Sequence, residues 1–342
     1  MTNIIKVGIV GLGTIGKRVA ETIMLQDDME LTGVVFRHLN VNALAAKSQN
    51  MPVFLQDIRE KARFTQSGIQ IDGDINNLLE QVHIVVDCTP RGQAERNIDL
   101  YRSYQLPVIL QGGEREHVGL TCNSFVNLGK LKQESIIRIG SCNTTGIVRI
   151  LCALQQQIEI QHVFVALVRC ATDPDKSNKG IVNGLTMSLA KSHHTHDVNL
   201  LLPNIQLYTT AIAAPMTHGH LLMFVVDIGG EATLEEIKTS IAEHPRIEIL
   251  PSGYSQNTSS IEGYYDQRKR GDRPFVIVIE DSIELEGEKL YFTASVHMEA
   301  IVIPDTIDAI RAKFSTLPLN EIIYKTDTTL GIEKKWEAYH NR

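Results

Sequence analysis

The residues with the most distinctive chemistry are Ser141-Cys142-Asn143-Thr144-Thr145-Gly146, a thiol among small polar side chains. The segment follows an apolar run at 136–139 that is typical of a strand, and apolar residues at helical spacing come after it. A helix N-terminus favours an anion, so we expect a lowered pKa and a nucleophilic role for the Cys142 thiol. The alternative is that Cys142 is a small buried apolar residue, as most free cysteines are.

A second chemical signal is Gly11-Leu12-Gly13-Thr14-Ile15-Gly16, which has the spacing G-x-G-x-x-G. It lies between an apolar run at 4–10 and a helical pattern, and a second apolar run follows at 31–36. In this context Gly11 permits a tight turn, Gly13 lets the backbone approach a pyrophosphate, and Gly16 lets the helix pack on the strand. We therefore predict a dinucleotide site, with a plain strand-to-helix turn as the alternative.

The choice of cofactor depends on the end of the second predicted strand, where Arg37 and His38 stand and no acidic residue occurs before Asp57. An acidic residue there would bind the ribose of NAD, whereas Arg37 is suited to the 2′-phosphate of NADP. We predict NADP or NAD as cofactor, unless Arg37 is only a solvated surface residue. Thr89 and Gly112 end two further predicted strands, where open α/β sheets bind ligands, and are candidates for nicotinamide or ribose contacts or for turns.

Five of the twelve histidines lie in two short stretches, His193-His194-Thr195-His196 and His218-Gly219-His220. A cysteine nucleophile needs a proton acceptor. His218 directly precedes a predicted strand beginning at Leu221, so we predict His218 as the general base, with His220 as the alternative. The first stretch suits an anion such as a phosphate group. Zinc is the competing interpretation, but H-H-x-H lacks helical i, i+4 spacing and no carboxylate or thiolate partner is evident, so we predict no metal.

Composition limits the class of protein. The 342 residues are enough for two domains, and the net charge of −7 argues against binding nucleic acid or an anionic membrane. We see no apolar run of the roughly 20 residues that a membrane span needs, and no signal peptide. Five scattered cysteines without a C-x-x-C pair fit a reducing environment, so we expect a cytoplasmic enzyme.

The chain divides into regions of different pattern. Strand and helix signals alternate over residues 1–140, which predicts an α/β domain with a Rossmann-type, doubly wound parallel sheet. Residues 141–303 carry long strand signals with few helices, which predicts a second α+β domain with a mostly antiparallel sheet. Residues 304–342 contain a helix, 305–314, that we expect to pack back onto the first domain. Residues 251–273 are rich in turn formers and predict a surface excursion.

Several motifs together resemble the archaeal-type (type II) glyceraldehyde-3-phosphate dehydrogenases. They are V-G-I-x-G-x-G-T-I-G-K-R-V-A at 7–20, D-D-M-E-L at 27–31, Q-G-G-E at 111–114, S-C-N-T-T-G at 141–146, D-P at 173–174, S-H-H at 192–194, H-x-H at 218–220 and I-P-x-x-I-D-A-I-R at 303–311. The resemblance covers nearly the whole chain. It implies NADP or NAD, inorganic phosphate, glyceraldehyde 3-phosphate as substrate, a homotetramer and a place in glycolysis or gluconeogenesis.

The resemblance also implies roles for matching residues: Cys142 as nucleophile, His218 as catalytic histidine, Ser141, Asn143, His193 and His194 as substrate contacts, and Thr14, Ile15 and Gly112 as cofactor contacts. The thiolate would attack the aldehyde, a hydride would pass to the nicotinamide while His218 takes the hydroxyl proton, and phosphate would release the acyl group from the thioester. Asn143 and backbone N–H groups at the helix start would stabilise the oxyanion.

The chain departs from the family in three places. Arg169-Cys170 stands where two arginines are usual, so Arg169 remains as the anion contact and is predicted for the cofactor. Met298 replaces a glutamine near the nicotinamide, and residues 36–38 replace a Lys-rich segment. Two other functions stay open: a semialdehyde or acyl-phosphate reductase, such as aspartate-semialdehyde dehydrogenase, and a non-catalytic NADP-binding sensor. The paired histidines favour a phosphorylated sugar, and the intact cysteine, asparagine and histidine favour an enzyme.

Overall fold

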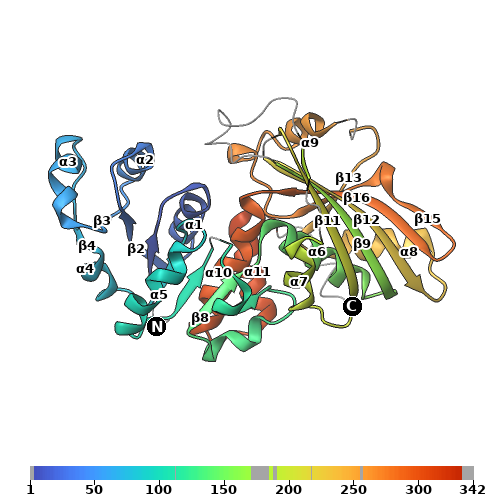
Figure 1. Ribbon diagram of the computed structural model, residues 1–342, viewed down its shortest axis with the longest axis horizontal. Coiled ribbons are helices and arrows are strands. Elements are labelled where there is room, and N and C mark those ends of the chain that lie inside the picture. Colours follow the sequence, from blue (N-terminus) through green and yellow to red (C-terminus); the bar gives the residue numbers. More distant parts are fainter. Residues whose placement is uncertain are drawn as a thin grey trace. The chain divides into compact units, whose positions relative to one another are not determined.

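The computed structural model describes residues 4–111, 113–170, 185–187, 191–216, 218–254 and 257–332. They form two compact units, whose elements are labelled in Figure 1. The first unit contains the chain up to Gly140 together with Ile303–Leu330, and the second contains Ser141–Val302. Each unit is built on a sheet of its own.

The first unit has an eight-stranded sheet in the order β4-β3-β2-β1-β5-β6-β8-β7, with every pair parallel. The strands are β1 (Ile5–Val10), β2 (Met29–Phe36), β3 (Val53–Leu55), β4 (Gly73–Asp74), β5 (Ile84–Asp87), β6 (Val108–Leu110), β7 (Leu120–Cys122) and β8 (Ile136–Ile139). The order reverses between β1 and β5, the switch point at which doubly wound sheets bind ligands. The predicted Rossmann-type sheet is confirmed.

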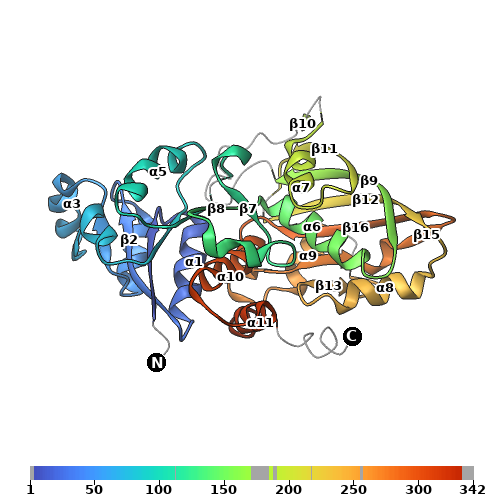
Figure 2. The ribbon, with the colours of Figure 1, turned by 90° about the horizontal axis from the view of Figure 1, so that it is seen from below.

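The helices of the first unit are α1 (Thr14–Met24), α2 (Val41–Ser48), α3 (Lys61–Gln66), α4 (Ile75–Leu79), α5 (Gln93–Ser103), α10 (Ile303–Phe314) and α11 (Leu319–Leu330). Although α10 comes after the second unit in sequence, it packs beside α1 (Figure 2). Its buried Arg311 donates to the carboxylate of Asp28, 2.7 Å away, and to the side-chain oxygen of Gln26 at 2.6 Å. Two motifs of the resemblance, at 27–31 and 303–311, therefore meet in a structural contact.

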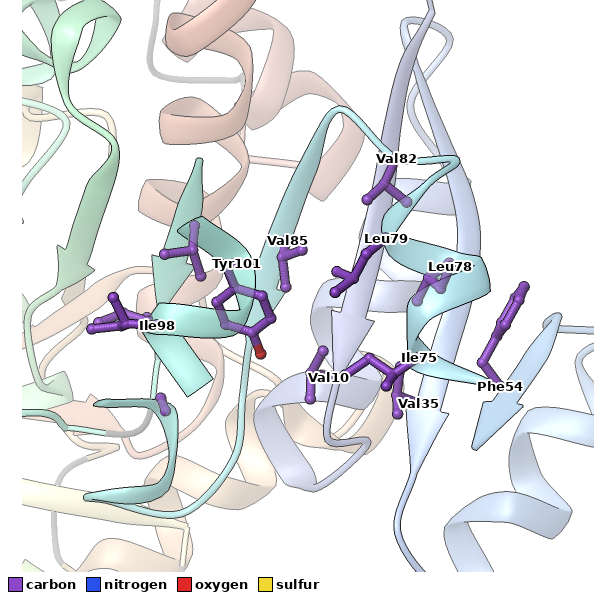
Figure 3. Close-up of a cluster of buried hydrophobic side chains, with 13 residues drawn as sticks. Val10, Val35, Phe54, Ile75, Leu78, Leu79, Val82, Val85, Ile98 and Tyr101 are labelled. Carbon is purple, nitrogen blue, oxygen red and sulfur yellow. The ribbon is translucent and has the colours of Figure 1, made fainter. Parts of the chain in front are cut away.

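A buried apolar cluster holds β1 in place. Val10 and Val35, from neighbouring strands, lie beside Ile75 and Leu79 of α4 (Figure 3). Burying side chains of this size contributes about 1.5–3 kcal/mol each. The carboxyl end of β1, from which the glycine turn continues, is therefore firmly positioned.

The second unit has a sheet in the order β10-β11-β9-β12-β16-β14-β13, with β15 paired to β16. The strands are β9 (Glu159–Cys170), β10 (Thr186–Met187), β11 (Gln206–Ala214), β12 (Gly219–Gly229), β13 (Ile247–Leu250), β14 (Val276–Ile279), β15 (Glu284–Glu286) and β16 (Lys289–His297). Only β9–β11 and β13–β14 are parallel among the described pairs, so the mostly antiparallel sheet is confirmed.

The helices of the second unit are α6 (Cys142–Leu154), α7 (His193–Asn199), α8 (Leu234–Glu243) and α9 (Thr258–Tyr264). α6 packs against α7, as Figure 1 shows, and against β16. Gly146 permits this approach, because a Cβ atom there would overlap the side chain of Val296. The surface excursion predicted for 251–273 is wrong in part: α9 buries Ile261, and the fully buried Arg273 pairs with Glu262 at 2.8 Å.

Candidate active site

The glycine turn between β1 and α1 has the backbone that dinucleotide binding requires. Gly11 has φ +89°, a value that favours glycine, and a Cβ atom on Gly16 would overlap the carbonyl oxygen of Gly11. A Cβ atom on Gly13 would meet no atom within 4 Å, so the backbone there is open to an approaching phosphate. Thr14 and Ile15 form the first turn of α1 and are half-buried. The three glycines therefore fit a pyrophosphate at this helix N-terminus.

Other residues predicted for the cofactor lie at the carboxyl ends of the strands of the first unit. Thr89 follows β5 and is next to Gly11, since its methyl group would lie 3.2 Å from a Cβ atom on Gly11. Its hydroxyl and main-chain N–H both donate to the buried carboxylate of Asp87. Arg37 is exposed directly after β2. Gly112 lies outside the described residues.

Cys142 is the first residue of α6, directly after the Ser141 N-cap, whose hydroxyl accepts from the N–H of Thr144 at 3.3 Å. The predicted strand, turn and helix are confirmed here, because β8 ends at Ile139 and α6 begins at Cys142. The residue as a whole is half-buried. It therefore stands at a helix N-terminus, in the position that the sequence predicts.

The predicted lowering of the Cys142 pKa is wrong for the protein alone. Burial raises the pKa of the thiol to about 11, and the negative charge of Glu299 adds to the rise. The positive charge of Arg169 and the main-chain N–H groups of Asn143 and Cys142 oppose it. The free-energy cost of desolvating the thiolate is larger than the stabilisation that it gains from the helix N-terminus and from the partly exposed guanidinium of Arg169. Arg169, predicted for the cofactor, thus acts on the thiol within the second unit.

The imidazole found at the thiol is that of His220, not the predicted His218. Its Nε2 lies 3.2 Å from Sγ of Cys142. His220 is inside β12 and shares the buried face with Leu222 and Phe224. His218 precedes the strand with φ +68°, which takes it out of the strand alternation, and its ring lies 6.4 Å from that of His297. The geometry therefore favours the alternative histidine.

The predicted substrate contacts Ser141, Asn143 and His194 lie together. His194 on α7 places Nδ1 3.2 Å from the Ser141 hydroxyl and Nε2 3.4 Å from the Asn143 amide nitrogen. Because that amide group is a donor, Nε2 is the acceptor and Nδ1 carries the proton. Burial lowers the pKa of His194 well below its usual value, so it is neutral. The buried Oδ1 of Asn143 has no hydrogen-bond partner among the described residues.

His193, also predicted for the substrate, is exposed beside His194, with ring centroids 4.0 Å apart. Asp197 lies one turn further along α7. Together with His193 and His194 it forms a cluster in which one potential metal-ligand atom from each residue lies within 4.8 Å of the others. The expectation that these histidines lack a carboxylate partner is therefore wrong, because Asp197 follows His193 at i, i+4 on the same helix. Both ring nitrogens of His194 already face Ser141 and Asn143, which favours a role in positioning the thiol segment.

Two of the family departures lie at this site. The main-chain N–H of Cys170 donates to Nδ1 of His220 at 2.9 Å, and its Sγ lies 2.9 Å from the carbonyl oxygen of Gly219. The N–H of Met298 donates to the carbonyl oxygen of His218 at 2.8 Å. Sequence reasoning missed the part of Cys170, since a main-chain contact leaves no signal in residue types.

None of the helices in the described part of the chain has the length and apolar character needed to cross a bilayer. Residues 141–265 match the family model "Glyceraldehyde 3-phosphate dehydrogenase, C-terminal domain", and residues 5–113 match "Dihydrodipicolinate reductase, N-terminus". The fold is similar to that of aspartate semialdehyde dehydrogenase II from Vibrio cholerae, with a TM-score of 0.66 at 11% identity over 91% of this chain and 98% of the other.

The full length of the chain also matches curated proteins. Glyceraldehyde-3-phosphate dehydrogenase of Aeropyrum pernix is 35% identical, over 97% of this chain and 99% of that protein. The enzyme of the same name from Archaeoglobus fulgidus is 36% identical, over 96% and 98%. With the thiol at the start of α6 and the glycine turn after β1, these matches show that the chain belongs to the glyceraldehyde-3-phosphate dehydrogenase family.

Proposed function

We propose that this chain oxidises glyceraldehyde 3-phosphate, with NADP or NAD and inorganic phosphate, to 1,3-bisphosphoglycerate, and that the reaction is reversible. The observation that carries the proposal is the thiol of Cys142 at the N-terminus of α6 with the imidazole of His220 3.2 Å away. A thiolate there attacks an aldehyde carbon, and the neighbouring N–H groups of the helix start face the developing oxyanion.

The cofactor is held by the glycine turn. The open backbone at Gly13 and the first turn of α1, with Thr14 and Ile15, would bind the pyrophosphate, and Arg37 would bind a 2′-phosphate. When bound, NAD(P) supplies the hydride acceptor. We retain Thr89 as a ribose or nicotinamide contact because it lies beside Gly11 at the switch point of the sheet. We propose Gly112 as a further cofactor contact on the basis of the family resemblance alone.

The substrate is recognised by the cluster next to the thiol. The buried Oδ1 of Asn143 is an acceptor without a partner among the described residues, and the C2 hydroxyl of glyceraldehyde 3-phosphate would donate to it from next to the reacting carbon. We assign the phosphate group to the exposed imidazole of His193, while His194 orients Ser141 and Asn143. Loss of the carboxamide oxygen would therefore weaken binding of the hydroxyaldehyde more than binding of the cofactor.

We further propose that the protein assembles as a homotetramer through the outer face of the second sheet. Phe164, Tyr208 and Met223, on three neighbouring strands, are 40%, 47% and 43% exposed, and the rings of Phe164 and Tyr208 stack at 6.1 Å. Contiguous exposed apolar side chains mark interaction surfaces. Sedimentation velocity of the wild type and of Phe164→Lys tests this: a tetramer that dissociates on substitution is expected, and a monomeric wild type contradicts it.

Five free cysteines fit a reducing compartment, so we place the enzyme in the cytoplasm, in glycolysis or gluconeogenesis. The central test of function is NADPH or NADH formation from glyceraldehyde 3-phosphate with and without inorganic phosphate. Phosphate-dependent formation is expected. Formation without phosphate would indicate a non-phosphorylating enzyme, oxidation of aspartate semialdehyde instead would indicate the reductase alternative, and cofactor binding without turnover would indicate a sensor. Cys142→Ser is the control for background reduction.

A further inference from the structure

The carboxyl end of β5 carries a buried carboxylate that is surrounded by hydrogen-bond donors. Asp87 is fully buried, and its Oδ1 accepts from the main-chain N–H of Thr89 at 2.9 Å and from the Thr89 hydroxyl at 2.5 Å. Its Oδ2 accepts from the Asn97 amide group at 2.9 Å and from the Tyr101 hydroxyl at 2.6 Å. Because a carboxylate has about four lone-pair sites, each site has a donor, and every donor is uncharged.

The direction of these hydrogen bonds is fixed by their surroundings. Gln93 donates to the Asn97 carbonyl oxygen at 3.2 Å, which leaves the Asn97 NH₂ group to face Asp87. Burial, followed by the charge of Asp87, raises the pKa of Tyr101, labelled in Figure 3, well above its usual value, so its hydroxyl stays protonated. An ionised carboxylate only accepts, so the Thr89 hydroxyl donates its one proton to Asp87. Toward any other group, the Thr89 oxygen is therefore an acceptor.

The loop that carries Thr89 is held at its other end as well. The buried Glu114 accepts from the main-chain N–H of Gly92 with both oxygens, at 2.8 and 2.9 Å, and from that of Ala94 at 3.2 Å. Gly92 is the N-cap of α5, so a carboxylate of the same unit already occupies that helix N-terminus. This arrangement leaves the N-terminus of α1, and not that of α5, to a cofactor phosphate.

The sheet order places Thr89 on the nicotinamide side of the cofactor site. β2 and β5 lie on opposite sides of β1, and their ends are level, because Val10 pairs with both Val35 and Asp87. The adenine ribose of a dinucleotide is read at the end of β2, so the nicotinamide half extends toward β5. The nicotinamide ribose is bonded directly to the pyrophosphate and its hydroxyl groups are donors, the partner that an accepting oxygen beside Gly11 requires.

We propose that Asp87 is a positioning residue that fixes the Thr89 hydroxyl as a hydrogen-bond acceptor for a hydroxyl group of the nicotinamide ribose. This inference rests on the proposed function and deepens it, because it selects the ribose rather than the nicotinamide ring as the partner of Thr89. Asp87 does not touch the cofactor. It takes the Thr89 proton, and this leaves the lone pairs of the Thr89 oxygen for the sugar.

Cofactor fragments separate this role from a general loss of structure. Calorimetric titration of the full-length protein with ADP, ADP-ribose and NAD adds first the second ribose and then the nicotinamide ring. For Thr89→Val, which keeps the shape of the side chain without the hydroxyl, we expect the Kd for ADP-ribose and for NAD to rise about tenfold, and the Kd for ADP to stay within about twofold. Equal rises for all three ligands would make Thr89 structural, and a rise for NAD alone would place its oxygen at the nicotinamide ring. Either result overturns the proposal.

Two further variants test the direction of the hydrogen bond and the part of Asp87. Thr89→Ser keeps the hydroxyl and should bind ADP-ribose within about threefold of the wild type. Asp87→Ala frees the Thr89 proton and should weaken binding of ADP-ribose about tenfold. Adding Thr89→Val to it should cost less than about twofold more, because both changes act through one hydroxyl. Losses that add, or a Ser variant as weak as Val, would overturn the proposal, and the Thr89 variants decide it if Asp87→Ala does not fold.

These titrations need no turnover, so they distinguish failure of this inference from failure of the proposed function. A wild type that binds NAD with the expected pattern in the variants, but does not oxidise the aldehyde, would contradict the proposed function and support the ribose contact. A wild type that binds none of the three ligands, or their 2′-phosphorylated forms, would overturn both.

Discussion

The glycine turn after β1 and the thiol site at the start of α6 are both strand-to-helix junctions, yet they are specified differently. At the turn, function comes from the backbone, and three glycines within six residues set it. At the thiol site, function comes from side chains on α6, α7 and β12 and from a main-chain N–H on β9, and the contacting residues are up to 78 positions apart. The first site is local and the second depends on strand register.

The largest difference between the two sites should appear on removal of the thiol. Cys142→Ser is expected to reduce kcat by more than about 10⁴-fold, because a hydroxyl ionises much less readily than a thiol and is a weaker nucleophile, while cofactor binding is unchanged. Stopped-flow turnover and calorimetric titration with NADP measure the two effects. Cys152→Ser, on the same helix, is the matched control and should retain activity. Turnover by the Cys142 variant would remove the nucleophile assignment.

The second comparison separates the two histidines. His220→Ala should lower kcat by about 10²- to 10³-fold, because it removes the group 3.2 Å from the sulfur. His218→Ala should lower it by less than about tenfold, since His218 lies before the strand at φ +68°. Single-turnover hydride transfer measures both. A larger loss for His218 would support the prediction that His218 is the general base. It would also show that the position of a histidine in the β12 register does not identify the base.

The reactivity of the Cys142 thiol tests whether desolvation outweighs the helix N-terminus and Arg169 in setting the pKa of the thiol. Because burial raises the Cys142 pKa to about 11, the neutral thiol is favoured, and the thiolate accumulates only as pH rises toward that value. In the cofactor-free protein, alkylation of Cys142 at pH 7 should be about 10²-fold slower than that of a cysteine peptide. Mass spectrometry after timed iodoacetamide labelling reports the site. An inflection at or below pH 7 would mean that the helix end and Arg169 outweigh desolvation.

Sequence patterns predicted the fold where periodicity was long, and failed where one or two residues mattered. β12 begins at Gly219, two residues before the predicted Leu221, and this shift is what puts His220 on the buried face with Leu222. Extending the apolar alternation back by one step from Leu222 would have found it. Phe314, the last residue of the predicted helix 305–314, is 42% exposed, so the apolar pattern overstates how much of the end of this helix is buried.

The other misses have physical causes that no spacing rule includes. The pKa of Cys142 depends on the balance between desolvation of its thiol and the charge of Arg169, which is distant in the sequence. The sequence indicates the helix N-terminus but does not show how deeply the thiol is buried. The contact of Cys170 with His220 uses the main chain, which every residue has. Arg311 and Asp28 are 283 positions apart in the sequence. The two motifs that contain them are recognisable separately, but their sequences do not predict that these two side chains pair.

The glycine turn can be dissected with one methyl group at a time. Gly16→Ala should destabilise the fold by about 1–3 kcal/mol, because its Cβ overlaps the carbonyl oxygen of Gly11. Gly13→Ala should leave Tm unchanged, since no atom lies within 4 Å of its Cβ, but should weaken NADP binding by about tenfold or more. Thermal unfolding and fluorescence titration measure the two effects. Equal decreases in Tm for the two variants would show that Gly13 is needed for folding stability, and would contradict the proposal that its backbone is open to the pyrophosphate.

The smallest effect expected concerns which cofactor the turn accepts. Arg37 is exposed just after β2, at the position where doubly wound sheets read the ribose. Arg37→Asp replaces a cation by an anion, which repels a 2′-phosphate but is able to accept from a 2′-hydroxyl. The Kd for NADP should therefore rise about tenfold, and the Kd for NAD should stay the same or fall. Because solvent screens an exposed charge, the effect on NADP should shrink in high salt. An equal change for both cofactors would mean that Arg37 contacts neither, and that selection lies with the packing of the glycine turn itself.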